Sequence, residues 1–425
     1  MKTPAVVPFD ANLFSAWFES LSAIGATPEG GVNRPFGSKE DRQVRAWLLQ
    51  VANQERLTTS VDAIGNIWGT RAGTEPLPAI VIGSHHDSVP YGGRFDGPLG
   101  VLIALSVIAA ITKAGISTRH PLTFVSFTAE EPNPFGLSTL GSRTVAGRLT
   151  PDVLWQTQSS DGTVLQDAVR AVGGDLNQVL QARRSDQDIA AFLELHIEQG
   201  LRLIRSSTPI GVVTGICGIY RERVVITGQA NHAGTTLLPD RHDALLAGAQ
   251  VALAVESAVA ALGKDDVIGT VGTFRIEPGA INVIPGMCEL VLELRTGHRE
   301  DLDALRADLD ARFAAIAQSR GITLVRSVLL DQAAQPLDAF LQETLQTSAR
   351  NLDIPYRDLF SMAGHDATHM ASLTRAAMLF VPSVGGKSHC PEEFTPLEDI
   401  CRAAQVLIHS VLALDENLDR QDGIS

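Results

Sequence analysis

Residues 83–97 read GSHHDSVPYGGRFDG and lie between two apolar segments of different kinds. Residues 79–83, AIVIG, form a short apolar run that predicts a buried strand, and residues 97–114 predict a buried helix. His85 and Asp87 alternate along the extended backbone after the strand, so both side chains can point to the same side. A strand that leads through polar residues into a helix indicates an α/β fold with chemistry at the strand end.

Similar combinations of an apolar strand and polar residues recur along the chain. They are GGRFDG at 92–97, Glu130-Glu131 after a strand at 122–128, ELHIEQG at 194–200 in a strand at 191–197, and GGKSHCPE at 385–392 after a strand ending at 381. Taken singly, Asp96 reads as a helix N-cap, the glutamates as a solvated strand end and His196 as a core histidine. Together the motifs supply the mixed histidine and carboxylate set suited to zinc, manganese or cobalt.

Size, charge and cysteine usage narrow the class of protein. A chain of 425 residues exceeds one compact core, so we expect two domains. The net charge of −14 argues against a nucleic-acid partner. The apolar stretch at 100–111 is too short to cross a membrane, and no extended apolar region follows Lys2, so neither a membrane partner nor a secretory signal is expected. Four scattered cysteines without a CxxC pair fit a reducing, cytoplasmic location.

The middle of the chain follows a different pattern. Predicted elements are a strand at 224–227, a helix at 243–262, strands at 267–276 and 288–294, and a helix at 301–319. This order suits a small ferredoxin-like domain. Residues 322–330 and the elements after them are expected to return to the first domain. We therefore predict a catalytic metal-binding domain at 1–210 and 322–425, with an inserted domain at 211–321.

The stretches GSHHDSVPYGGRFDG, ELHIEQG, ANHAGTT, NVIPG and GHDA occur in this order. They resemble the hydantoinase/carbamoylase group of the M20 metallopeptidase superfamily, over most of the chain, from Asp62 to His389. The resemblance implies an M20-type catalytic α/β domain with an inserted ferredoxin-like α+β domain that serves in dimerisation and as a lid. It implies a homodimeric amidohydrolase that cleaves the C–N bond of a small ureido substrate such as an N-carbamoyl-L-amino acid.

The resemblance also implies the residues of the site. The metal ligands would be His85, Asp96, Glu131, His196 and His389, with Asp96 shared by two divalent ions (zinc, manganese or cobalt). Glu130 is expected to act as general base on the metal-bridging water and to pass the proton to the departing nitrogen. Asp87 is expected to orient His85.

Further matching positions imply contacts with the substrate. Gln199 follows the His196 strand, and Asn282 and Arg295 would bind the substrate carboxylate, which an arginine fork suits geometrically. His232 would reach the neighbouring subunit's site and stabilise the tetrahedral intermediate. Without its motif, Arg295 would be interpreted as a surface ion pair. His365 and Asp366 of GHDA also match, but the resemblance assigns them no role.

Departures from the family pattern leave the substrate open. They are EPNPFG at 131–136, where many relatives have an arginine, Leu237-Leu238 after ANHAGTT, Glu293 before Arg295, and Lys387. The alternatives are an allantoate amidohydrolase or a β-ureidopropionase, then an M20 aminoacylase or dipeptidase. A non-catalytic binding protein of this family would be expected to lack a metal ligand or the general base. This chain has all five expected metal ligands and Glu130.

Overall fold

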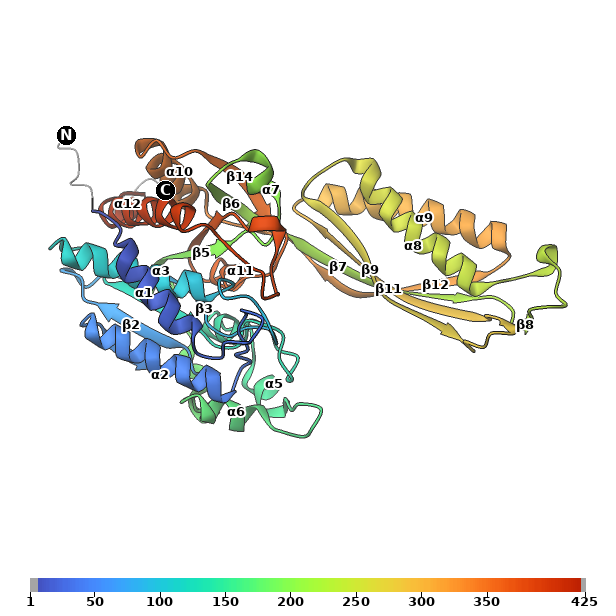
Figure 1. Ribbon diagram of the computed structural model, residues 1–425, viewed down its shortest axis with the longest axis horizontal. Coiled ribbons are helices and arrows are strands. Elements are labelled where there is room, and N and C mark those ends of the chain that lie inside the picture. The colour runs from blue at the N-terminus through green and yellow to red at the C-terminus, as the bar shows by residue number, and fades with distance from the viewer. Residues whose placement is uncertain (1–6, 422–425) are drawn as a thin grey trace. The chain divides into compact units, whose positions relative to one another are not determined.

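The computed structural model describes residues 7–421, which divide into two compact units (Figure 1). Unit 2 comprises Gly215–Gln335 and Phe360–Gly364, and unit 1 comprises the rest, so unit 2 interrupts the chain of unit 1. The helices of unit 1 are α1 Ala11–Ser22, α2 Lys39–Gln54, α3 Pro98–Lys113, α4 Leu140–Val145, α5 Pro151–Gln156, α6 Leu165–Ala171, α7 Arg202–Ser206, α10 Ala339–Asn351, α11 Ala367–Met370 and α12 Leu397–Gln421.

A nine-stranded sheet organises the larger part of the fold, in the order β1-β2-β4-β3-β5-β15-β6-β13, with β14 paired to β6. Its strands are β1 Thr58–Val61, β2 Ile67–Arg71, β3 Ala79–His85, β4 Leu122–Phe127, β5 Ile189–Ile197, β6 Ile210–Ile216, β13 Gln335–Pro336, β14 Tyr356–Ser361 and β15 Arg375–Val381. The central strands β4, β3, β5 and β15 are parallel. Their carboxyl ends therefore meet at one edge, the usual ligand-binding edge of an α/β sheet.

Helix α3 is buried along most of its length, with every residue from Pro98 to Ile111 shielded from solvent. It packs on β3, β4 and β5 and also contacts α1 and α12. At Gly100 a Cβ atom would lie 2.4 Å from the carbonyl oxygen of Leu195, so only glycine allows the helix to approach β5 this closely. An all-apolar helix is expected in such a position, and the predicted helix at 97–114 is confirmed.

Unit 2 has the element order β-α-β-β-α-β, that of a ferredoxin-like unit. The elements are β7 Gly218–Thr227, α8 Ala244–Leu262, β9 Val267–Glu277, β11 Met287–Thr296, α9 Arg299–Arg320 and β12 Thr323–Gln332, with a small ribbon of β8 Asn231–His232 and β10 Val283–Ile284. The four-stranded antiparallel sheet has the order β12-β7-β11-β9. Helices α8 and α9 lie side by side on it (Figure 1).

One expectation about the end of the middle segment is wrong. The chain does not return to the first domain at residue 322, because β12 pairs with β7 from Thr323 to Gln332 and forms an edge of the unit 2 sheet. The reason is physical: β12 has no fully buried face, and its partner lies about a hundred residues earlier. A local pattern cannot reveal so distant a pairing.

Helix α8 is, among residues 7–421, the one helix whose length and hydropathy match those of a membrane span. A core helix passes the same test. Its side chains Ala247, Val251, Val255 and Ala258 are buried, and the helix contacts α9, β9 and β11. Its apolar character is therefore accounted for in part by packing within unit 2.

Candidate metal centre

Five residues from separate motifs meet at the carboxyl edge of the parallel strands. His85 ends β3 and His196 lies near the end of β5, while Glu131 and His389 follow β4 and β15. Three groups of potential ligand atoms form among residues 7–421, each with all its atoms within 4.8 Å of one another. Two of them share Asp96: His85, Asp96 and His196 form one, and Asp96, Glu131 and His389 form the other. The third group, Glu194, His196 and His365, shares only His196 with them.

The two oxygens of Asp96 face different partners. Oδ1 lies 3.2 Å from Nε2 of His196 and 3.6 Å from Nε2 of His85. Oδ2 lies 3.3 Å from Nε2 of His389, which is itself 3.5 Å from Oε1 of Glu131. The Asp96 carboxylate thus lies between two sets of potential ligand atoms, as a carboxylate that bridges two metal ions does.

The ring orientation of the two buried histidines suits metal binding. Nδ1 of His85 lies 3.1 Å from the carbonyl oxygen of Asp87, and Nδ1 of His196 lies 3.0 Å from that of Ile197. When each Nδ1–H donates to its carbonyl, each Nε2 presents a lone pair. Nε2 of His196 is buried and has no hydrogen-bond partner among the described residues. A divalent cation between these atoms would satisfy that lone pair, so the residues present fit a metal.

Glu393, which the sequence analysis missed, holds the Asp96 loop. Its carboxylate accepts hydrogen bonds from the backbone N–H of Phe95 at 2.8 Å and of Asp96 at 3.0 Å. Any side chain at Gly93 would collide with it, since a Cβ atom there would lie 2.1 Å from the carboxylate. The signal was present as the second glutamate of Pro391-Glu392-Glu393, one residue beyond the motif that we considered.

Asp96 receives two further hydrogen bonds at its Oδ2 atom. Nε2 of Gln199 donates at 2.7 Å, and Oγ of Ser388 donates at 2.9 Å. Gln199, expected to contact the substrate, thus has a definite contact with the candidate bridging carboxylate. Gln199 and His389 both have positive φ, a conformation that non-glycine residues adopt at a cost and that clusters at functional sites.

Asp87 has a broader role than the sequence suggested. Its Oδ1 and Oδ2 accept hydrogen bonds from the backbone N–H groups of Glu130 and Glu131, each at 3.2 Å. The contact with His85 is shortest at the carbonyl oxygen of Asp87, while its Oδ1 lies 3.5 Å from Nδ1. Asp87 therefore positions the backbone of Glu130 and Glu131 as well as the ring of His85. Ala129, just before the pair, has a φ of +53°, so this turn is strained.

The loop after the glutamates, which departs from the family pattern, is closed by one side chain. Nδ2 of Asn133 donates to the carbonyl oxygens of Glu131 at 3.3 Å and Leu137 at 3.0 Å. Oδ1 of Asn133 accepts from the N–H of Phe135 at 3.0 Å. Asn133 thus ties together residues 131–137 on both sides of its two flanking prolines.

Crowded carboxylates shift the acidity of the metal-free centre. Burial raises the pKa of Glu130 well above its usual range, and burial together with Asp96 raises the pKa of Glu131 to about 7. The hydrogen bond with Asp96 raises the pKa of His389 to about 9. Protons on these three side chains therefore offset the negative charge of the crowded carboxylates. A bound cation would take the place of these protons.

His365 and Asp366 lie behind His196. The His365 ring meets the His196 ring edge-on at a centroid distance of 4.6 Å, and burial holds the pKa of His365 well below its usual range. Asp366 accepts a hydrogen bond from Oγ of Ser142 at 2.5 Å. Glu194 accepts from the N–H of Ala367 at 3.0 Å. A neutral His365 thus packs against a candidate ligand and limits its movement.

The other three predicted substrate contacts belong to unit 2. Nδ1 of the exposed His232 accepts from the N–H groups of Gly234 at 3.0 Å and Thr235 at 3.2 Å, so its proton lies on Nε2. Nε of Arg295 donates to Glu293 at 2.7 Å, and its Nη1 donates to the carbonyl oxygen of Met362 at 2.6 Å. Asn282 precedes β10 and its carbonyl oxygen accepts from the N–H of Ala233 at 3.0 Å.

Comparison with known proteins decides the family. The model of peptidase family M20/M25/M40 matches residues 81–413. The chain belongs to this family. The M20 chain is 36% identical over 395 residues to an N-carbamoyl-L-amino acid amidohydrolase of Geobacillus stearothermophilus, covering 93% of this chain and 96% of that protein. It is 33% identical over 385 residues to an allantoate amidohydrolase of Bacillus subtilis, covering 90% and 93% of the two proteins.

A solved structure agrees. A hydantoinase/carbamoylase family amidase from Burkholderia multivorans superposes with a TM-score of 0.89 at 32% identity, covering 96% of this chain and 98% of that one. The similarity therefore extends over both units. The M20 chain is a hydrolase of C–N bonds with candidate metal-binding groups.

We predict that Glu393→Gln weakens the binding of divalent cations by about 10- to 100-fold, because the loop that carries Asp96 loses its charged acceptor. Chelator competition with zinc or manganese measures the change. Glu392→Gln is the matched control, since the neighbouring carboxylate is 65% exposed and contacts Lys387, at 3.9 Å, and Cys390, neither of which is a candidate ligand. Equal affinities of the two variants would contradict the role given to Glu393.

Proposed function

We propose that the chain hydrolyses the ureido C–N bond of an N-carbamoyl-L-amino acid, using two divalent cations and Glu130 as general base. One observation carries this proposal: Asp96 faces a separate set of ligand atoms with each oxygen, and the carboxylate of Glu130, only 12% exposed, lies 3.8 Å from Nε2 of the candidate ligand His85. The names of relatives at 33–36% identity support a ureido substrate.

The metal ligands in this proposal are His85 and His196 for one ion, Glu131 and His389 for the other, and Asp96 for both. Zinc, manganese and cobalt all suit this donor set. When bound, such cations lower the pKa of a water molecule and polarise the scissile carbonyl group.

Glu130 carries the proton in this proposal. It is well placed for that task because Asp87 fixes the backbone before and within the glutamate pair, and because burial raises the pKa of its carboxyl group. A base with a pKa closer to neutrality accepts a proton from water and then donates it to the departing nitrogen. Glu131 cannot share this work while it binds a cation.

Unit 2 supplies the groups for recognition of the substrate. Nε2–H of His232 is a hydrogen-bond donor because Nδ1 is already an acceptor, so it can stabilise negative charge on the carbonyl oxygen in the transition state. Arg295 and Asn282 are proposed to bind the substrate carboxylate. For Arg295 this requires the part of the guanidinium that Glu293 and Met362 do not use.

Allantoate is the second candidate substrate, since one relative at 33% identity is named for it. Allantoate and N-carbamoyl amino acids share a ureido group and a carboxylate, so the same catalytic centre serves both. Selection between them depends on the shape of the pocket, which typically contributes a few kcal/mol.

A substrate panel tests the reaction class. The protein is stripped of metal, reloaded with zinc, manganese or cobalt, and assayed for ammonia and amine release. The panel holds N-carbamoyl-L-amino acids, N-carbamoyl-β-alanine, allantoate and N-acetyl amino acids. We expect metal-dependent ammonia release from a ureido compound. Turnover of the acetyl compounds alone would instead place the chain among the aminoacylases.

Substitution of the base tests the mechanism. Glu130→Gln is expected to keep its metal content while kcat falls by about 10²–10⁴-fold, because the proton acceptor is lost and the shape is kept. Metal content by atomic emission and kcat on the best panel substrate are measured together. Unchanged turnover with metal bound would remove Glu130 from the mechanism.

We further propose that unit 2 forms a homodimer through β9 and α8. Strand β9 is an edge of its sheet, and residues 270–274, TVGTF, carry no charge. Long, uncharged edge strands are templates for pairing with another strand. Exposed apolar side chains lie on the same two elements. Leu246 and Leu253 lie two turns apart on one face of α8, and Ile268 and Phe274 lie on β9. A twofold axis beside β9 would cover both features.

Complementation tests whether His232 acts across this dimer. His232→Ala and Glu130→Gln are each expected to be nearly inactive. Co-expressed in equal amounts, they should recover about one quarter of wild-type activity, because about half of the dimers contain both chains and each of these has one complete site. A mixture no more active than its components would show that His232 serves its own chain or none.

A further inference from the structure

A pocket lies in unit 1, at the opposite end of α3 from Asp96. Helix α3 has 16 residues, so it is about 24 Å long, and Asp96 lies just before its start. The pocket is about 800 Å³ and is lined by residues 8–13 at the start of α1, by residues 54–56 at the end of α2 and by the second half of α3. That volume is within the usual range for small-molecule sites.

Ser106, on the α3 side of this pocket, has an unusual hydroxyl group. Ser106 is 4% exposed, lines the pocket, and its hydroxyl group has no hydrogen-bond partner among the described residues. Several other helical serines donate to the carbonyl oxygen four residues earlier, as Ser20, Ser257 and Ser410 do at 2.8 to 2.9 Å. An unpaired buried hydroxyl costs free energy, and a polar group of a ligand beside Ser106 would satisfy it.

The lining of α3 forms a track with a polar group at each end. Ser106, Ala109, Ala110 and Lys113 all line the pocket and occupy one face of the helix, at positions i, i+3, i+4 and i+7. Seven residues correspond to about 10.5 Å along the axis. Two small apolar side chains thus separate a buried hydroxyl from an ammonium group, and Phe9 and Leu13 of α1 add apolar surface.

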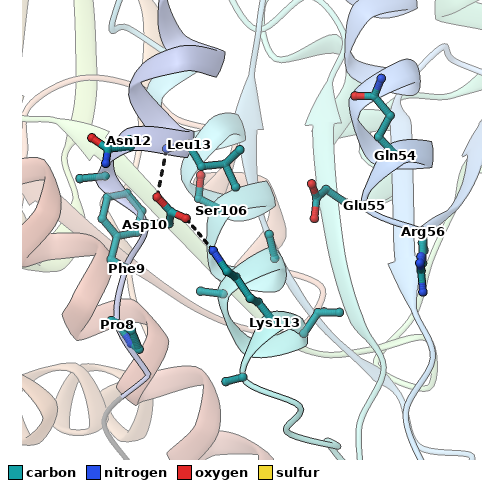
Figure 2. A pocket seen from close by; sticks show the side chains of 15 residues that line it. Pro8, Phe9, Asp10, Asn12, Leu13, Gln54, Glu55, Arg56, Ser106 and Lys113 are labelled. Atoms are coloured by element: carbon teal, nitrogen blue, oxygen red, sulfur yellow. Dashed lines mark hydrogen bonds and ion pairs between the residues drawn. The ribbon is translucent and has the colours of Figure 1, made fainter.

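Lys113, which lines the pocket, can donate more hydrogen bonds than Asp10 accepts from it. Figure 2 shows Asp10 between Leu13 and Lys113: Oδ1 accepts from the N–H of Leu13 at 3.1 Å and Oδ2 from Nζ of Lys113 at 3.0 Å. Both oxygens of Asp10 therefore already accept a hydrogen bond. Nζ of Lys113, by contrast, has three donor positions, and the Lys113 side chain is 77% exposed. Arg56 adds a second cation and Glu55 a competing anion. A carboxylate of a ligand is one group that the remaining donors of Lys113 can bind.

We propose that this pocket binds a medium-length carboxylic acid that carries a hydroxyl or carbonyl group near the far end of its chain. The carboxylate pairs with Lys113, the hydrocarbon chain lies on Ala109 and Ala110, and the distal polar group bonds with Ser106. The proposal does not depend on the hydrolytic reaction, because none of these residues belongs to the metal centre.

Three linear probes separate the contacts: hydroxyoctanoate with both polar ends, octanoate without the distal hydroxyl, and octanediol without the carboxylate. Calorimetric titration of the metal-loaded protein should give the tightest binding for hydroxyoctanoate. Ser106→Ala is expected to weaken hydroxyoctanoate by about 3- to 10-fold, the effect of one hydrogen bond, and to leave octanoate unchanged. Ser257→Ala is the matched control, since that hydroxyl is already paired within its helix.

Two further variants test the rest of the track. Lys113→Gln should weaken both acids and leave octanediol unchanged, because only the charged end loses its partner. Ala110→Leu should weaken binding of all three probes because the larger side chain narrows the track between Ser106 and Lys113, with melting curves to confirm folding. Saturable binding that Ser106→Ala, Lys113→Gln and Ala110→Leu all leave unchanged would place the probes elsewhere, for example at the metal centre, and would overturn the proposal. Absence of saturable binding at millimolar probe would do the same.

Discussion

The candidate metal centre depends on one constraint, that several carboxylates and imidazoles remain close together where little water reaches them. Asp96 is central to it. Its oxygens face His85, His196 and His389, and Gln199 and Ser388 donate to it from other segments. Buried carboxylates repel one another unless protons or cations intervene. The rest of unit 1 serves to hold this arrangement, through parallel strands that end at one edge and through a helix, α3, that begins directly after Asp96.

Much of this arrangement could be predicted from sequence because it is local. The strands at 79–83, 122–128 and 191–197 and the helix at 97–114 have clear apolar patterns, and the chemistry follows each of them within a few residues. Parallel strands bring such segments to a common edge, where His85, Glu131 and His196 lie. The strand ends could be recognised from their apolar patterns, whereas the choice of these three residues as ligands was implied by the resemblance to the family. The roles of these residues stay predictions, as do those of His232, Asn282 and Arg295.

What escaped the sequence analysis is long-range. The contact of Glu393 with the N–H of Asp96 spans 297 residues, and β12 pairs with a strand about a hundred residues earlier. The carboxylate of Asp87 bonds with amides 43 and 44 residues away. In each case no local pattern in the sequence identifies which residue the partner contacts. A glycine such as Gly93 is informative only once the carboxylate beside it is known.

The shared carboxylate has a consequence for assembly of the centre. In a chain that binds two cations through Asp96, the first ion would fix the Asp96 side chain and displace protons from its neighbours. The second ion would then meet a site that is already ordered and deprotonated. The affinities for the two ions would therefore be coupled through one side chain. A change at Asp96, or at the groups that hold it, would alter the occupancy of both positions together rather than of one alone.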